Sequence, residues 1–212
     1  ISYRLVGSEM CIRDRTSDLG GDVTTENGGA TFTDAATLTA SVVVNSSANN
    51  GAILFSSTID MGGFNLNLNA GSGGDVTVTG DVSNGGTLTV VDGDEVVLNV
   101  LTLDTLDVQD ATTSVALDGT VNADDGVTVT SGGTVSVGAD VSANVDGGTA
   151  AVSFTAGSSF SQTTGTIDSD GGSVSIDAGT DATIDGTVLS GGGTATVTAD
   201  NDISFGASSS LD

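Results

Sequence analysis

Positive charge is nearly absent from this chain of 212 residues, which contains 28 acidic residues, three basic residues and no histidine. The basic residues are Arg4, Arg13 and Arg15, so residues 16–212 carry no cation. Nucleic-acid binding needs lysine or arginine to displace counterions from the phosphate backbone, and an amphipathic membrane-surface helix uses a basic face. The sequence therefore predicts no nucleic-acid binding and no basic membrane-surface helix.

Several other residue types are missing or rare. Histidine is absent and Cys11 is the only cysteine, which excludes histidine-dependent catalysis, Cys/His zinc sites and a disulfide framework. The longest apolar runs, such as residues 42–44, are far too short to span a bilayer. The sequence therefore predicts no transmembrane segment.

Aromatic residues make up only 3% of the chain, although hydrophobic residues make up 37%. This hydrophobic content is too high for a charge-dominated disordered chain. The core must be built from Val, Ile, Leu and Ala, which suit a thin, regularly stacked interior better than a large rounded one. The composition therefore favours a repetitive fold.

Residues 1–15, ISYRLVGSEMCIRDR, differ in composition from everything that follows. They resemble the translated read-through of a sequencing adapter, so they are predicted to be a non-native artefact or a disordered head. A genuine N-terminal segment with a local shift in composition is the alternative. If the head is an artefact, Cys11 and the three arginines carry no function. The absence of an initial methionine and the abrupt end at Asp212 suggest a fragment.

The body of the chain repeats a short unit, an apolar–Ser/Thr–apolar triplet beside a glycine turn. Strict alternation places the apolar residues on one side and the hydroxyls on the other, as in a half-buried β-strand. The triplets occupy residues 76–78, 127–129, 135–137, 152–154, 174–176 and 203–205.

A longer period links these triplets. Residues 174–184 align with residues 195–205 at an offset of 21, and the opening at 152–157 precedes the first of these segments by almost the same interval. Residues 66–71 repeat the same opening, whereas residues 95–125 fit the frame poorly. We therefore divide the body into weaker β repeats at 16–61 and a β-helix repeat region at 62–212. Glycine pairs punctuate the series at 132–133, 147–148, 171–172 and 192–193.

A period of roughly 21–22 residues that holds two or three short strands predicts an all-β fold, a parallel β-helix in which each strand stacks on its counterpart one coil later. Gly, Asn and Asp supply the corner turns, and proline is absent because it would remove a donor from the ladder. Roughly nine coils at ~4.8 Å per coil give a rod on the order of 40 Å long. A tandem of β-sandwich modules is the alternative.

The repeats GGSVSIDAGTDATIDGTV (171–188) and GGTATVTADNDISFGASSSL (192–211) resemble those of bacterial exoproteins of the filamentous-haemagglutinin and autotransporter-passenger type. The resemblance implies a right-handed β-helix, export across an outer membrane and an extracellular or cell-surface location. It also implies adhesion or biofilm roles, with a host or environmental surface, or a glycan, as partner. The family's secretion domain and C-terminal barrel are not found in these residues, so the export route stays open.

Carboxylates are the only ionised groups that the body offers for a site. Asp124 with Asp125, the segment 92–95 and the segment 168–170 bring carboxylates close enough to share Ca²⁺. None of them follows an EF-hand loop or the calcium-binding nonapeptide, and such clusters are more often solvated turns. We therefore predict no cofactor, leave Ca²⁺ open, and assign no catalytic, cofactor-binding or metal-ligating residue.

Thr-x-Thr pairs at 77/79, 87/89, 128/130 and 194/196 suggest an ice-binding array, but their intervals are uneven and Thr favours outward strand positions anyway. Asn65, Asn67 and Asn69 alternate with apolar residues. They fit either the start of an asparagine ladder or one solvated strand face.

We predict that the chain is not an enzyme. Polysaccharide lyases need a basic residue that the body lacks, and no carboxylate pair stands out for glycoside hydrolysis. The leading hypothesis is a non-enzymatic stalk or passenger fragment of a secreted or surface-displayed bacterial adhesin-like exoprotein. The alternative is a carbohydrate- or Ca²⁺-binding β module of a large extracellular protein. Unpaired strand edges at both ends predict that the isolated piece self-associates.

Overall fold

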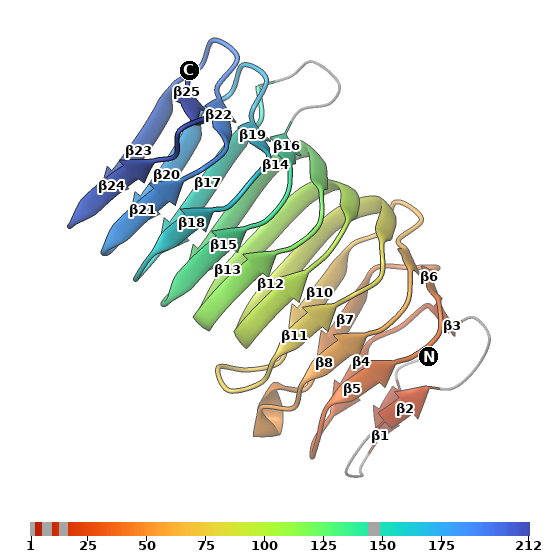
Figure 1. The fold of residues 1–212 in the computed structure, drawn as a ribbon. Helices are drawn as coiled ribbons and strands as arrows, with labels where there is room; N and C mark the ends of the chain where they lie inside the picture. The colour runs from red at the N-terminus through yellow and green to blue at the C-terminus, as the bar shows by residue number, and fades with distance from the viewer. Residues whose placement is uncertain (1–2, 6–9, 13–16, 144–148) are drawn as a thin grey trace.

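The computed structural model describes residues 3–5, 10–12, 17–143 and 149–212, with side chains described in the last two ranges. The chain forms a right-handed parallel β-helix of about nine turns. Its coils stack along a rod that has β1 (Tyr3–Leu5) at one end and β25 (Ser210–Leu211) at the other (Figure 1). Every strand pairing is parallel, as between β17 (Ala151–Ala156) and β20 (Val174–Ala178). The predicted parallel β-helix is therefore confirmed, and the alternative, a tandem of β-sandwich modules, is wrong.

The strands stack into three faces, here called A, B and C. The short strands of face A are β1 (Tyr3–Leu5), β4 (Val23–Thr25), β7 (Val42–Asn45), β10 (Leu66–Asn69), β17, β20 and β23 (Ala195–Ala199). Those of face B are β2 (Met10–Ile12), β5 (Ala30–Phe32), β8 (Ile53–Phe55), β11 (Val76–Val78), β15 (Thr134–Val137), β18 (Phe160–Gln162), β21 (Asp181–Ile184) and β24 (Asp202–Phe205). Those of face C are β3 (Ser17–Leu19), β6 (Ala36–Leu38), β9 (Ile59–Asp60), β16 (Val141–Ala143), β19 (Thr166–Asp168), β22 (Thr187–Leu189) and β25 (Ser210–Leu211).

Three longer strands complete the stack in the middle of the rod. β12 (Val82–Leu98) and β13 (Leu101–Leu117) each run through faces C, A and B in turn, and β14 (Val121–Ser131) runs through C and A. One short 3-10 helix, η1 (Ser47–Asn49), links β7 to β8. Strands of the predicted segments 16–61 and 62–212 stack directly on one another, as β7 does on β10.

Alternation along each strand builds the core. In β11, Val76 and Val78 are buried and Thr77 faces outward, as the triplet pattern predicts. The same inward positions stack from coil to coil, so Val, Leu, Ile and Ala form apolar columns. The buried Gln162 interrupts one of these columns on face B, between Val137 and Ile184. Aromatic rings join these columns at two places: Phe32 and Phe55 stack with their ring centres 4.3 Å apart, and Phe154 lies 5.4 Å from Phe160.

Coil length varies more than the sequence predicts. The predicted offsets are confirmed near the C-terminal end, where Val152 pairs with Val174 and Val174 pairs with Ala195. Elsewhere the coils are shorter, as between the stacked residues Leu88 and Leu106, or longer, as between Val141 and Ile167. A single repeat length therefore describes only part of the rod.

Residues 95–125, which fit the repeat poorly in sequence, belong to the same β-helix. They lie in β12, β13 and β14, where Val96 stacks on Val115 and Val115 stacks on Val135. The coils are short there because the extended backbone bends around the corners, and residues 95–125 contain no glycine pair. The missing glycine pairs, not a change of fold, hide the repeat.

The triplets that share one pattern in sequence do not share one position in the fold. Residues 127–129 lie on face A, whereas residues 76–78 and 135–137 lie on face B. Inward apolar positions on all three faces meet the same core, so alternation predicts burial but not the face.

Part of the predicted head is included in the stack. The backbone of β1 pairs with β4 and that of β2 pairs with β5. Arg4 lies in β1 and Cys11 in β2, whereas Arg13 and Arg15 lie outside the described residues. That residues 1–15 are a non-native artefact or a disordered head stays a prediction.

Candidate functional site

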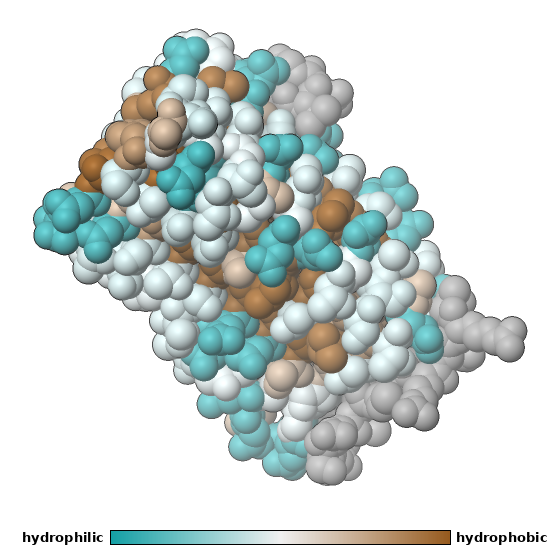
Figure 2. Space-filling view, in the orientation of Figure 1, coloured by the Kyte–Doolittle hydropathy of each residue, from teal (hydrophilic) through white to brown (hydrophobic). Residues whose placement is uncertain are grey.

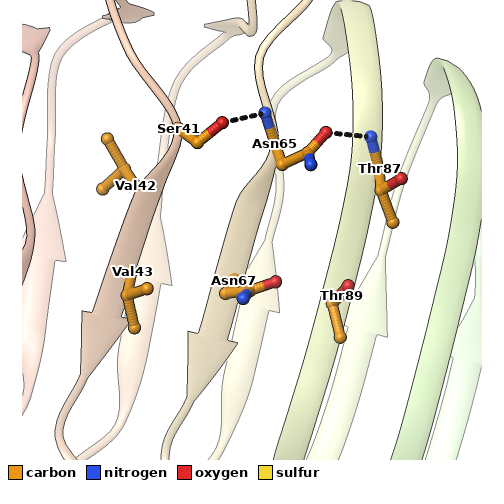
Figure 3. A pocket seen from close by; sticks show the side chains of 7 residues that line it. All are labelled: Ser41, Val42, Val43, Asn65, Asn67, Thr87 and Thr89. Carbon is orange, nitrogen blue, oxygen red and sulfur yellow. Dashed lines mark hydrogen bonds between the residues drawn. The ribbon is translucent and has the colours of Figure 1, made fainter.

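A hollow of about 350 Å³ opens on the outer surface of face A, across β7, β10 and β12. The side chains around it form two rows, and Val42, whose own side chain is buried, lies between them (Figure 3). The lining residues are Ser41, Val42, Val43, Asn65, Asn67, Thr87 and Thr89.

Strand register sets the row of Val43, Asn67 and Thr89. Asn67 pairs with Val43 on one side and with Thr89 on the other, so the three residues occupy one outward position in three successive coils. Adjacent strands lie about 4.8 Å apart, so the row is about 10 Å long. The inward neighbours Leu66 and Leu68 are fully buried and fix the strand that carries Asn67.

The second row, Ser41, Asn65 and Thr87, lies at the start of the same strands. The Asn65 backbone N–H donates to the Ser41 hydroxyl oxygen at 3.2 Å. The Thr87 backbone N–H donates to the Asn65 side-chain oxygen at 2.9 Å. These bonds (Figure 3) connect the three coils and orient the Asn65 amide, whose two N–H donors stay available.

The other polar groups in the hollow are also available to a ligand. Among the described residues, no partner accepts from or donates to the side chains of Asn67 and Thr89, both of which are partly exposed. An amide both donates and accepts, and so does a hydroxyl. The hollow therefore presents paired donors and acceptors on a rigid strand surface.

Carboxylates border the hollow but do not line it. Asp22 occupies the position before Val43 in the row, and its carboxylate accepts from the Val43 backbone N–H at 3.0 Å. Asp107 follows Thr89 in the row, and its carboxylate accepts from the Gln109 side-chain amide at 2.8 Å. The neutral interval is therefore three coils long, with one carboxylate at each end.

The three acidic segments named from the sequence do not converge. Within the described ranges, no three His, Cys, Asp or Glu side chains lie close enough together to hold a metal ion. Asp168 accepts from the Asp170 backbone N–H at 2.8 Å, and Asp94 accepts a hydrogen bond from the Thr113 hydroxyl. Asp124 and Asp125 lie side by side in β14. The carboxylate of Asp168 thus stabilises a turn, and that of Asp94 connects two neighbouring coils.

The carboxyl of Asp92 is partly withdrawn from water. Burial raises the pKa of its carboxyl, the nearby Asp110 carboxylate raises it further, and a hydrogen bond from the Gly93 backbone lowers it. One carboxylate oxygen of Asp92 is buried without a partner in the described part of the chain. This carboxyl disfavours its ionised form because of where it lies in the stack.

The asparagines of β7 and β10 form a two-residue ladder. Asn45 pairs with Asn69, and each caps the next turn by accepting a backbone N–H, from Ser47 at 3.0 Å and from Gly71 at 3.1 Å. Asn67 instead lies between Val43 and Thr89. The Asn and Thr-x-Thr motifs were noted separately in the sequence, and neither predicted a hollow. The sequence did not show that they are neighbours.

The C-terminal end of the rod exposes apolar side chains whose counterparts in the preceding coil are buried. Ile203, Phe205 and Leu211 are 44%, 50% and 44% exposed, although they stack on buried Ala182, Ile184 and Val188. Hydrophobic surface is visible at this end in Figure 2. Self-association through such an end stays a prediction.

Comparisons with known proteins give no relative. The chain matches no protein-family model, and no curated protein and no solved structure is similar to it. Among the described residues there is also no apolar helix of membrane-spanning length.

Proposed function

We propose that the chain is a non-enzymatic stiff segment of a secreted or surface-displayed bacterial adhesin-like exoprotein, where it spaces a binding region from the cell. The observation that carries this proposal is the unbroken stack of three ladders around one apolar core. Three ladders that do not lie in one plane resist bending in every direction. Stiffness and fixed length are what a spacer needs.

The surface charge agrees with an extracellular spacer. A formal net charge of −25 keeps rods apart and soluble, although at a Debye length of ~8 Å in physiological salt most of the repulsion is screened. The resemblance of the repeats to haemagglutinin-type exoproteins supports the same role. The alternative predicted from the sequence was a carbohydrate- or Ca²⁺-binding β module, and its Ca²⁺-binding form has no favouring observation among the described residues.

Stiffness is measurable between two labels on face A. Spin labels at Thr24→Cys and Thr196→Cys, in a Cys11→Ser background, lie eight coil steps apart and should report one narrow distance of about 38 Å. A broad distribution, or a mean far below this value, would refute the spacer. For location, antibody against the chain should label intact cells that carry the gene. Labelling that requires permeabilised cells would refute surface display.

A further inference from the structure

We propose that the hollow on face A binds a neutral oligosaccharide, whose hydroxyl groups exchange hydrogen bonds with Asn65, Asn67, Thr87 and Thr89. This binding site goes beyond the mechanical role and does not depend on it. The same surface would give the rod a contact with a glycan part-way along its length.

The lining of the hollow complements the chemistry of a sugar. A sugar hydroxyl both donates and accepts a hydrogen bond, and the groups that complement it are amides and hydroxyls, which do the same. The Asn67 amide and the Thr89 hydroxyl have no partner among the described residues, and the Asn65 amide keeps both N–H donors free. Val43 adds an apolar contact for the C–H groups of a sugar ring.

The groups that line the hollow are preorganised. The Asn65 side chain is held by its bond to the Thr87 backbone, and its own backbone is held by Ser41. Asn67 and Thr89 stand on strands whose neighbouring residues are fully buried. Because little ordering remains to be done on binding, even a few hydrogen bonds give measurable affinity.

The charges around the hollow favour a neutral ligand. No charged group lines the hollow, and the nearest residues along its row at either end, Asp22 and Asp107, are carboxylates. These carboxylates accept hydrogen bonds from sugar hydroxyls but repel a uronate or a sialylated glycan. The site therefore selects neutral sugars over acidic ones.

The dimensions limit the ligand. The row from Val43 to Thr89 is about 10 Å long, and residues two apart along a strand are about 7 Å apart. Two or three sugar rings lying along the rod axis match this space. Since no aromatic ring lines the hollow, we expect a dissociation constant in the millimolar range.

The test uses the full chain labelled with ¹⁵N and four trisaccharides as probes. Maltotriose, cellotriose and the N-acetylglucosamine trimer are neutral, and trigalacturonate is the acidic control. At least one neutral probe at about 20 mM should give saturable shifts in the side-chain amide signals of Asn65 and Asn67. Trigalacturonate should give none. Absence of shifts with all three neutral probes, or equal shifts with trigalacturonate, would overturn the proposal.

Variants locate the site. Asn67→Ala and Thr89→Val should each weaken binding of the responding trisaccharide about five- to tenfold, the effect of losing one hydrogen-bonding group. The matched control is Thr128→Val, an outward threonine on the same face one coil beyond Asp107, which should leave binding unchanged. Unchanged melting temperatures confirm that the variants fold. Binding that survives both variants, or that falls equally in the control, would refute the site.

Discussion

The last two coils of the rod have the same pattern of inward residues, but their burial differs. Ile184 in β21 is fully buried, whereas Phe205, stacked directly on it in β24, is 50% exposed. Each inward residue of a β-helix is covered by the coil before it and the coil after it, and Phe205 has only the first. Stability is therefore a sum over neighbouring coils, and the same side chain contributes differently in the middle and at the end.

Two phenylalanines of face B should show the largest effect of this difference on the free energy of unfolding. Phe55 stacks between Phe32 and Val78 and is 1% exposed. Phe55→Ala should lower the free energy of unfolding by about 3–5 kcal/mol, because it removes buried ring contacts and leaves a cavity. Phe205→Ala should cost less than half as much. Urea unfolding midpoints measure both, and equal losses would contradict the dependence on neighbours.

Two glycines at equivalent positions in successive coils, Gly172 and Gly193, test how tightly the coils approach each other. A Cβ added at Gly172 would lie 1.8 Å from the Ala150 carbonyl oxygen, and one at Gly193 would lie 1.8 Å from the Gly172 carbonyl oxygen. Gly172→Ala should cost about 1–3 kcal/mol, since coils on both sides prevent relief of the clash. Gly193→Ala should cost less because only one neighbouring coil opposes its movement. Thermal melts of the two variants measure this, and a larger loss at Gly193 would contradict it.

The regular C-terminal coils also show why part of the fold could be predicted from the sequence. Between Val152 and Ala199 each coil has nearly the same length, so equivalent residues recur at a fixed offset. Strict alternation predicted that residues such as Val174 and Ile176 are buried. The fixed offset and the alternation together predicted the fold class.

The middle coils show what the sequence does not contain. The step from Leu88 to Leu106 takes fewer residues than the step from Val44 to Leu68, although both cross one coil of face A. Corner geometry sets these lengths, and local patterns do not reveal it. Asn67 and Thr89 were therefore noticed separately, because their contact depends on the exact register of β10 and β12.

The smallest expected effect concerns Asp92, which the stack partly buries beside the carboxylate of Asp110. Because folding raises the pKa of Asp92, ionisation of this carboxyl disfavours the folded state. The penalty is absent below the unfolded pKa of about 3.9 and is complete above the folded pKa. Asp92→Asn should therefore raise the melting temperature at pH 7, and the gain should shrink towards zero as the pH falls to about 3.

Asp110→Asn separates the two causes of this shift. Burial is the larger cause and the Asp110 charge the second, so Asp110→Asn should raise the melting temperature at pH 7 by less than Asp92→Asn does. An equal or larger gain would mean that repulsion between the two carboxylates, and not burial, dominates. The contrast between covered and uncovered positions then extends to charge. A carboxylate on the open surface keeps its hydration, whereas one drawn between coils is favoured in its neutral form.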